Sequence, residues 1–123
     1  MDITKLFDLS DRVIIITGAA GNLGSKYAEG LSQAGANLVL ADLDYARCKK
    51  LGKQLESKYS TKTLAVKLDL TNKISIKNMV SKSMKEFSKI GCKTGVLCMP
   101  VMPYISDDNK NLDEIFRLTK EYN

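Results

Sequence analysis

The chain has 123 residues, of which 44% are hydrophobic and 27% are charged, and its formal net charge is +5. These proportions are typical of an ordinary soluble globular protein, and the length corresponds to one domain or part of one. No apolar run approaches the roughly 20 residues that span a bilayer. The acidic start MDITKLFDLSDR also lacks the pattern of a secretory signal. We therefore expect a cytoplasmic protein with no membrane partner.

Cysteine, histidine and lysine usage excludes several classes of site. The three cysteines, Cys48, Cys92 and Cys98, form no CxxC pair, and the chain contains no histidine. Because most structural zinc sites need four nitrogen or sulfur ligands, the sequence predicts no metal site. Lysines are frequent between residues 73 and 89, without interleaved aromatic residues or an arginine cluster. We interpret them as a solvated helix face and expect no nucleic-acid partner.

Short apolar runs alternate with amphipathic segments through residues 1–90. The runs that predict buried strands are 12–17 (RVIIIT), 37–42 (NLVLAD) and 63–68 (TLAVKL). Each is followed by apolar residues at helical spacing. Gly35 is positioned to end the first of these helices. Thr71 or Asn72 is positioned to cap the start of the third helix, and Gly91 is positioned to end it.

This order, β-α-β-α-β-α, specifies a parallel sheet with right-handed crossovers. The predicted fold is therefore α/β, a Rossmann-like three-layer sandwich. Its parallel sheet has three to four strands, which makes it an incomplete doubly wound sheet. The fourth strand is predicted at 96–102 (VLCMPVM), where Pro100 and Pro103 limit its length, and a helix follows at 112–122.

The segment TGAAGNLG, residues 17–24, lies where the first strand turns into the first helix. Gly18 permits the tight turn, Gly21 leaves no Cβ between the backbone and a pyrophosphate, and Gly24 lets the helix lie close to the sheet. The free N–H groups and the positive dipole end of that helix would face a diphosphate. The candidate phosphate-binding residues are Thr17, Gly18, Gly21, Asn22, Leu23 and Gly24.

An acidic residue follows at the spacing that a dinucleotide site requires. Asp42 ends the second strand, about twenty residues on, where an acid accepts hydrogen bonds from the adenosine ribose. Asp44 is nearby, but the position at the strand end favours Asp42. The same carboxylate would repel a 2′-phosphate, so the sequence predicts NAD in preference to NADP. Arg47 argues in the other direction.

Residues 8–90 resemble the N-terminal part of a short-chain dehydrogenase/reductase. DRVIIITGAAGNLG resembles that family's opening strand and TGxxxGxG loop, and ADLD at 41–44 resembles the end of its second strand. KLDLTN at 67–72 is similar to the segment that meets the adenine, so the resemblance implies that role for Asp69 and Leu70. Asn22 stands where the commonest subfamily has its middle glycine, and the loop equally fits the TGxxGxxG of the extended subfamily.

The resemblance also implies catalytic residues, and we predict none in this chain. The family has an NNAG motif, a catalytic Ser and a Tyr-xxx-Lys pair further along, whereas here the segment after Ile90 reads GCKTGVLCMPVMP. The Tyr-xxx-Lys spacing occurs at Tyr45 and Lys49, with Ser32 upstream. Helix geometry separates Ser32 from Tyr45 by roughly 15 Å, so we interpret this match as coincidental. We expect a truncated, inactive oxidoreductase or, alternatively, a dinucleotide-binding module without catalysis.

Residues 91–123 resemble a strand-loop-helix unit of a radical S-adenosylmethionine enzyme of the DNA-photolyase-like type. They contain no cluster-binding CxxxCxxC motif. An ordinary βα unit of the same domain is the competing interpretation. The predicted organisation is a dinucleotide-binding half-domain at 1–90 and a tail of different origin at 91–123, with a radical S-adenosylmethionine-related fragment as a third hypothesis.

Overall fold

The computed structural model describes residues 2–88 and 93–96. Four parallel strands form one sheet in the order β3-β2-β1-β4. The strands are β1 (Arg12–Thr17), β2 (Asn37–Asp42), β3 (Thr63–Lys67) and β4 (Lys93–Val96). The helices are α1 (Ile3–Leu6), α2 (Asn22–Gln33), α3 (Tyr45–Lys58) and α4 (Lys73–Phe87).

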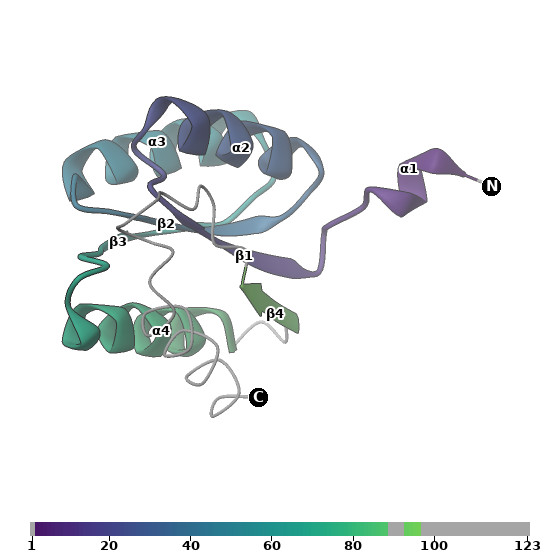
Figure 1. Cartoon of the computed structure of the whole chain (residues 1–123). Coiled ribbons are helices and arrows are strands. Elements are labelled where there is room, and N and C mark those ends of the chain that lie inside the picture. Colours follow the sequence, from purple (N-terminus) through teal and green to yellow (C-terminus); the bar gives the residue numbers. More distant parts are fainter. Residues whose placement is uncertain (1, 89–92, 97–123) are drawn as a thin grey trace.

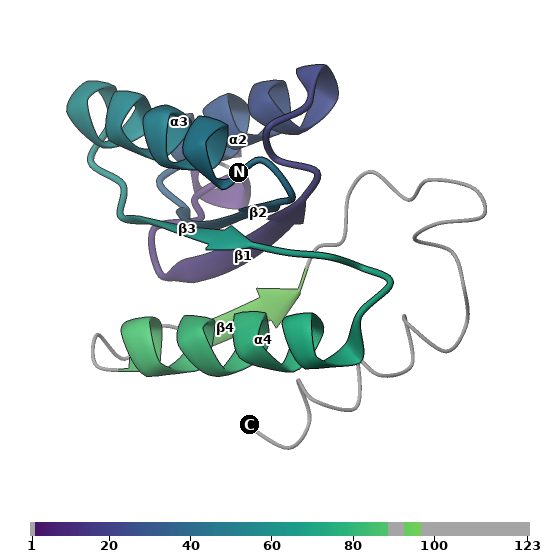
Figure 2. The same cartoon turned by 90° about the vertical axis from the view of Figure 1, so that its left-hand side faces the viewer.

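The sheet lies between two layers of helix. Helices α2 and α3 cover one face, and α4 covers the other (Figures 1 and 2). Each face has its own buried apolar cluster, and the strand residues alternate between the two. This arrangement confirms the predicted α/β three-layer sandwich with a parallel sheet.

The register of the strands brings the candidate residues to one edge of the sheet. Thr17 lies opposite Ala41 in β2, and Ala41 lies opposite Val66 in β3. Because the strands are parallel, their carboxyl ends meet at the same edge, where ligands bind in open α/β sheets. The loop after β1, the end of β2 and the residues after β3 therefore lie beside one another.

Helix ends follow the predicted signals. Gly35, directly after α2 and its C-cap residue Ala34, has a φ of +89°, a conformation that favours glycine. Asn72 caps α4, and its Oδ1 accepts hydrogen bonds from the N–H groups of Ile74 and Ser75. Helix α4 ends at Phe87, earlier than the predicted stop at Gly91, which lies outside the described residues.

The fourth strand begins earlier than the sequence predicted. Strand β4 starts at Lys93 and pairs in parallel with β1, placing Arg12 opposite Lys93 and Ile15 opposite Val96. The segment KTGV is not an apolar run, so periodicity did not identify it; pairing with the free edge of β1 defines this strand. Residues 97–102 and the helix predicted at 112–122 lie outside the described residues.

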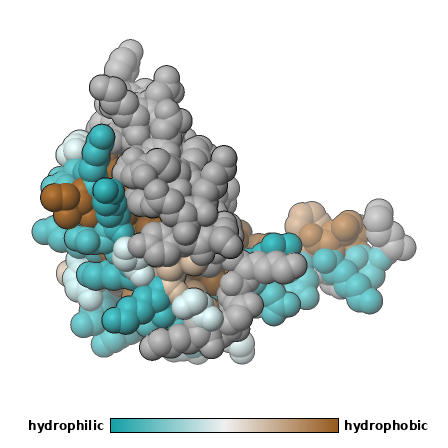
Figure 3. Space-filling model, turned by 90° about the horizontal axis from the view of Figure 1, so that it is seen from below, coloured by the Kyte–Doolittle hydropathy of each residue, from teal (hydrophilic) through white to brown (hydrophobic). Residues whose placement is uncertain are grey.

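The N-terminal segment leaves the body of the domain. Helix α1, which the sequence analysis did not predict, stands apart from the sheet (Figure 1). Three apolar side chains are exposed there, Ile3 by 65%, Leu6 by 60% and Phe7 by 68%, and apolar surface is visible on this arm (Figure 3). Within the described ranges, no helix has the length and apolar character needed to cross a membrane.

Candidate functional site

The loop between β1 and α2 makes a tight turn that depends on glycine. Thr17 ends β1 and is only 2% exposed. Gly18 has a φ of +70°, in the left-handed region that side chains disfavour. The N–H of Gly21 donates a hydrogen bond to the carbonyl oxygen of Gly18 over 3.0 Å, which closes the turn. The chain then enters α2 directly.

Two further glycines allow close backbone contacts within this loop. A Cβ on Gly24 would lie 2.2 Å from the carbonyl oxygen of Gly18 and 2.9 Å from the Cα of Ala19. A Cβ on Gly21 would lie 3.2 Å from the same oxygen of Gly18. Gly24 was predicted to let the helix lie close to the sheet, and the atoms that a Cβ would meet belong to the turn that directly follows β1.

The start of α2 has the properties of an anion-binding helix end. Its N-cap is Gly21, in extended conformation, which has no side chain to cap the helix. The first N–H groups of a helix have no partner within the helix, and they carry the positive end of its dipole. Asn22 and Leu23 are exposed here, Leu23 by 57%. The first turn is thus open to a ligand.

Of the two candidate acids, Asp42 faces the loop and Asp44 does not. Asp42 Oδ2 accepts a hydrogen bond from the N–H of Ala20 over 3.1 Å, and its Oδ1 accepts one from the N–H of Asp44 over 3.0 Å. The carboxylate of Asp44 caps α3 by accepting the N–H of Arg47. Asp42 is therefore the acid beside the candidate phosphate site, at the end of β2.

Asp69 is fixed in a turn after β3. Its Oδ1 accepts hydrogen bonds from the N–H and the hydroxyl of Thr71, and these bonds lower the pKa of its carboxyl group. The N–H of Asp69 donates to the Ser75 hydroxyl oxygen over 2.9 Å. Leu70 is half-buried against the cluster beneath α4. The roles of Thr71 and Ser75 in this turn were not predicted, because their hydrogen bonds to Asp69 form only in the folded turn.

A small basic hollow of about 280 Å³ adjoins the loop. Ala19 and Ala20 form one wall, and Arg47 and Lys50 of α3 contribute two positive charges. Arg47 was considered from the sequence, but Lys50 was not, because only the turn of α3 brings it beside Arg47. A negative group near Ala20 would be attracted to this side of the site.

Cys48 lies behind the loop. It is fully buried in the same apolar cluster as Ala19, Ala20 and Leu40. Burial, followed by the negative charges of Asp42 and Asp44, raises the pKa of the thiol to about 12. The sulfur is therefore a neutral packing group and not a nucleophile at neutral pH.

The Ser, Tyr and Lys that match a catalytic spacing do not face a common surface. Ser32 lies on the buried side of α2 and is 3% exposed, whereas Tyr45 begins α3 and is 43% exposed. A buried hydroxyl and an exposed phenol on separate helices do not converge on one substrate atom. Across residues 2–88 and 93–96, no group of three or more His, Cys, Asp or Glu side chains is placed to hold a metal ion.

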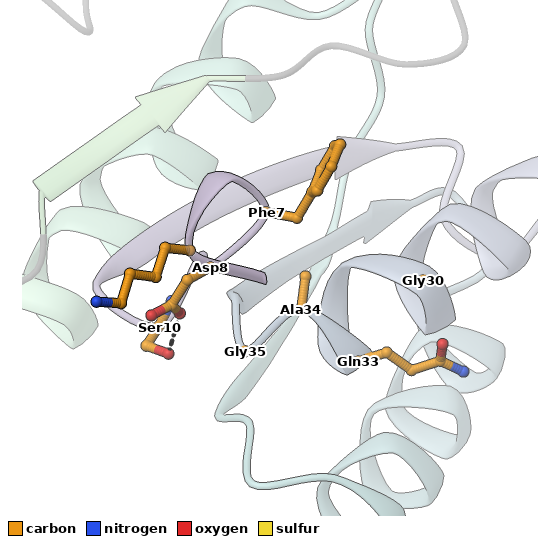
Figure 4. Close-up of a pocket in the computed structure, with 8 residues that line it drawn as sticks. Phe7, Asp8, Ser10, Gly30, Gln33, Ala34 and Gly35 are labelled. Atoms are coloured by element: carbon orange, nitrogen blue, oxygen red, sulfur yellow. Dashed lines mark hydrogen bonds between the residues drawn. The ribbon is translucent and has the colours of Figure 1, made fainter. Parts of the chain in front are cut away.

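A larger hollow lies at the opposite end of α2 (Figure 4). Its volume is about 690 Å³, and its lining comes from the N-terminal segment and the end of α2. Lining residues include Phe7, Asp8, Gln33 and Gly35. The carbonyl end of a helix carries partial negative charge, which disfavours a diphosphate. The carboxyl edge of the sheet is therefore the better candidate site.

Comparisons with known proteins agree with this assignment. The sequence profile of the short chain dehydrogenase family matches residues 12–96. The chain is 35% identical over 86 residues to an NAD-dependent glycerol dehydrogenase of Listeria innocua, covering 70% of this chain and 32% of that protein. It is 34% identical over 83 residues to an NADP-dependent 3-hydroxy acid dehydrogenase of Schizosaccharomyces pombe, covering 67% and 32%.

A solved structure has the same arrangement. The short chain dehydrogenase/reductase of Burkholderia phymatum, in complex with NAD, superimposes with a TM-score of 0.61 at 25% identity, covering 66% of this chain and 28% of that protein. The chain thus spans about a third of the length of the curated relatives that it matches. Residues 91–96 fall inside the family match, and the resemblance of 91–123 to radical S-adenosylmethionine enzymes finds no support in these comparisons.

Proposed function

This chain belongs to the short-chain dehydrogenase family, and we propose that it binds the adenosine-diphosphate half of a nicotinamide dinucleotide, with NAD preferred over NADP. The first turn of α2 faces the diphosphate, Asp42 the adenosine ribose, and Asp69 and Leu70 the adenine. Bound there, the dinucleotide would supply a nicotinamide ring that donates or accepts hydride. The proposed phosphate contacts are Thr17, Gly18, Gly21, Asn22, Leu23 and Gly24.

The observation that carries this proposal is the shape of the loop. Gly18, at a φ of +70°, turns the backbone so that α2 begins without a side-chain cap. A Cβ on Gly21 would crowd the Gly18 carbonyl at 3.2 Å, and a Cβ on Gly24 would collide with it. The loop thereby leads into the first turn of α2 without a side-chain cap, and uncapped N–H groups at a helix N-terminus are the arrangement that binds phosphate.

The test is a calorimetric titration of the 123-residue chain with NAD. Gly21→Val should abolish binding, because the added side chain occupies the space of the diphosphate. Gly30→Val is the matched control, since a Cβ on Gly30 meets no atom within 4 Å and the residue lies towards the other end of α2. If wild type and Gly21→Val bind NAD equally well, the loop is not a phosphate site.

The preference for NAD rests on a balance of charges near Ala20. Asp42 would repel a 2′-phosphate, whereas Arg47 and Lys50 in the adjoining hollow would attract one. The carboxylate lies at the strand end, where the ribose binds in this fold, so we give it the greater weight. The relatives themselves divide, one being named NAD-dependent and the other NADP-dependent.

The ratio of the NADP and NAD dissociation constants tests this balance. Asp42→Ala should lower the ratio of the NADP dissociation constant to the NAD dissociation constant, because it removes the repulsion of the 2′-phosphate. Arg47→Gln should raise this ratio, because it removes an attraction. Lys53→Gln, on α3 but outside the hollow, removes the same charge and should leave the ratio unchanged. Tighter binding of NADP than of NAD by the wild type would contradict the proposal and would assign the choice to Arg47.

We propose further that these 123 residues bind the dinucleotide without catalysing its reaction. Carbonyl reduction needs a proton donor for the alkoxide, and loss of such a group typically reduces the rate by about 10²–10⁴-fold. Ser32 is buried and Tyr45 stands on a separate helix. Assays with NADH and a panel of ketones and sugars should show no turnover. A rate that disappears in Tyr45→Phe would contradict this proposal.

A further inference from the structure

Asp42 joins two backbone segments at the candidate site. Its Oδ2 accepts the N–H of Ala20 in the phosphate loop, and its Oδ1 accepts the N–H of Asp44 just before α3. The side chain is partly buried, at the end of a strand whose other residues form the core. One carboxylate thus links the loop, β2 and the entry to α3.

The bond to Asp42 adds to two backbone hydrogen bonds of the loop, from the Ala19 N–H to the Ala41 carbonyl oxygen over 3.3 Å and from the Gly21 N–H to the Gly18 carbonyl oxygen over 3.0 Å. Ala20 stands between Gly18 and Gly21, and glycine has more backbone freedom than any other residue. A diphosphate site requires the N–H groups in the first turn of α2 to face one ligand at the same time, and the loop determines where that turn lies. The bond from Ala20 to Asp42 fixes the middle of the loop, while Cys48 packs in the cluster beneath it.

We propose that Asp42 is a positioning residue for the phosphate loop, and that it supports diphosphate binding independently of any contact with ribose hydroxyls. This inference rests on the proposed function. The two roles are compatible, because a carboxylate has about four lone-pair sites and the two backbone bonds use two of them. Ribose hydroxyls would use the remaining sites.

Charge and positioning predict opposite effects on phosphate binding when Asp42 loses its charge. An ionised Asp42 repels a negatively charged diphosphate, so removal of its charge should by itself strengthen the binding of any phosphate ligand. The asparagine side chain of the Asp42→Asn variant has one acceptor oxygen and an amide group that cannot accept, so it could not hold both N–H groups. A positioning role therefore predicts weaker binding in Asp42→Asn, against the direction that charge alone predicts.

The experiment compares two ligands on the full 123-residue chain by calorimetry. ADP has both ribose hydroxyls, and 2′,3′-dideoxy-ADP has neither. Asp42→Asn should weaken binding of dideoxy-ADP roughly tenfold, the loss expected for a bond to a charged group. Asp44→Asn is the matched control, because asparagine caps a helix as well as aspartate does and the change of charge is the same. It should alter binding of dideoxy-ADP by less than about twofold.

The outcomes separate the inference from the proposed function. If Asp42→Asn binds dideoxy-ADP as well as or better than wild type does, and loses only ADP affinity, Asp42 acts through the ribose alone and the inference is wrong. Wild-type protein that binds neither ligand overturns the proposed function, and this inference with it. Weaker binding of both ligands in Asp42→Asn, with Asp44→Asn unchanged, supports the tether.

Amide hydrogen exchange of the ligand-free protein tests the inference first in the wild type, where no variant has to fold. In ¹⁵N-labelled wild type, the Ala20 N–H should exchange more slowly than the Asn22 N–H, which lies in the open first turn of α2. In folded Asp42→Asn, the protection of Ala20 should fall while strand amides such as Val39 stay protected. Equal exchange of Ala20 and Asn22 in the wild type would overturn the inference.

Discussion

The two faces of the sheet are packed in different ways. On the side of α2 and α3, the buried helix residues are small: Gly24, Ala28, Ser32, Cys48 and Gly52, with Leu55 as the exception. On the side of α4, most of them are large: Ile76, Met79, Val80, Ser83 and Phe87. Small residues let a helix approach the sheet closely, and large ones fill a space between layers. On the α2 and α3 face, close packing places the start of α2 against the end of β1. On the α4 face, the large residues form an ordinary apolar core.

The space around two glycines shows how closely α2 and α3 approach the sheet and the loop. A Cβ on Gly24 would come within 2.2 Å of the Gly18 carbonyl oxygen, and a Cβ on Gly52 within 2.5 Å of the Thr63 hydroxyl oxygen. The first obstacle is backbone and cannot move without changing the loop, whereas the second is a side chain that can rotate. The phosphate loop therefore depends on the absence of side chains at Gly21 and Gly24, and we expect the α4 face to contribute stability without shaping this loop.

The largest expected effect tests whether the α4 face is independent of the site. Phe87 is fully buried beneath the sheet, and Phe87→Ala should lower the free energy of unfolding by about 3–5 kcal/mol. Phe87→Leu, which keeps most of the volume, should cost less and leave a folded protein. Urea denaturation measures the stability, and calorimetry should find the NAD affinity of Phe87→Leu unchanged. A large loss of affinity in folded Phe87→Leu would show that the two faces are coupled.

Gly24→Ala should have the next largest effect. In contrast to Phe87→Leu, it should remove NAD binding even where the protein stays folded. The added methyl collides with loop backbone, and such overpacking costs about 1–3 kcal/mol of stability. Relief of the collision would displace Gly18 and Ala19, so NAD binding should be lost even where the variant is folded.

Gly30→Ala is the control within the same helix. A Cβ there meets nothing within 4 Å, and alanine favours helix over glycine by about 0.5–1 kcal/mol. Gly30→Ala should therefore raise the stability slightly and leave NAD affinity as it is. Equal NAD affinity in Gly24→Ala and Gly30→Ala would mean that the turn does not need its close backbone contact.

Cys48 provides a test of packing beneath the loop. Because the pKa of its thiol is raised from 9.0 to about 12, the neutral form is favoured in the folded state. The stability that this shift contributes is fully present below pH 9 and is lost as the pH rises towards 12. In a Cys92→Ser, Cys98→Ser background, iodoacetamide at pH 8 should modify Cys48 only after unfolding. Rapid modification of the folded protein would show that the loop opens.

Much of the fold could be predicted because it depends on local patterns. The apolar runs gave β1, β2 and β3, glycine at position 35 gave the end of α2, and an asparagine at 72 gave the cap of α4. These signals are short-range, since a strand buried on both faces is apolar throughout and a cap lies next to its helix. The family resemblance over 8–90 agrees with the profile match at 12–96.

What could not be predicted depends on residues that meet only after folding. Strand β4 has no apolar pattern and is defined by the edge of β1. The collision that requires Gly24 involves backbone atoms of Gly18, and the bond of Asp42 to Ala20 joins residues 22 positions apart. Sequence spacing identified Asp42 as a candidate, but its tether to the loop follows from the geometry of two neighbouring strand ends.

The smallest expected effect concerns the exposed seam between α2 and α3. Lys58 Nζ lies 2.8 Å from Glu29 Oε1, and the Tyr59 hydroxyl donates to the same oxygen over 3.2 Å. The bond and charge of Lys58, with the Tyr59 hydroxyl, lower the pKa of Glu29 below its ordinary 4.5. A lowered pKa in the folded state contributes stability above pH 4.5 that is lost as the pH falls further. Glu29→Gln should thus be less stable than wild type at pH 7, and the two should converge towards pH 3.

Salt and a neighbouring lysine separate this ion pair from general charge effects. Exposed ion pairs contribute little, and added salt screens them. The difference in Tm between wild type and Lys58→Gln should therefore be small at low ionic strength and should shrink in 1 M NaCl. Lys26→Gln is the control, because Lys26 Nζ lies 4.0 Å from Glu29 and its side chain is 80% exposed; it should change Tm less than Lys58→Gln does. If the two variants change Tm equally, the Glu29–Lys58 pair adds no specific stability to the seam between α2 and α3.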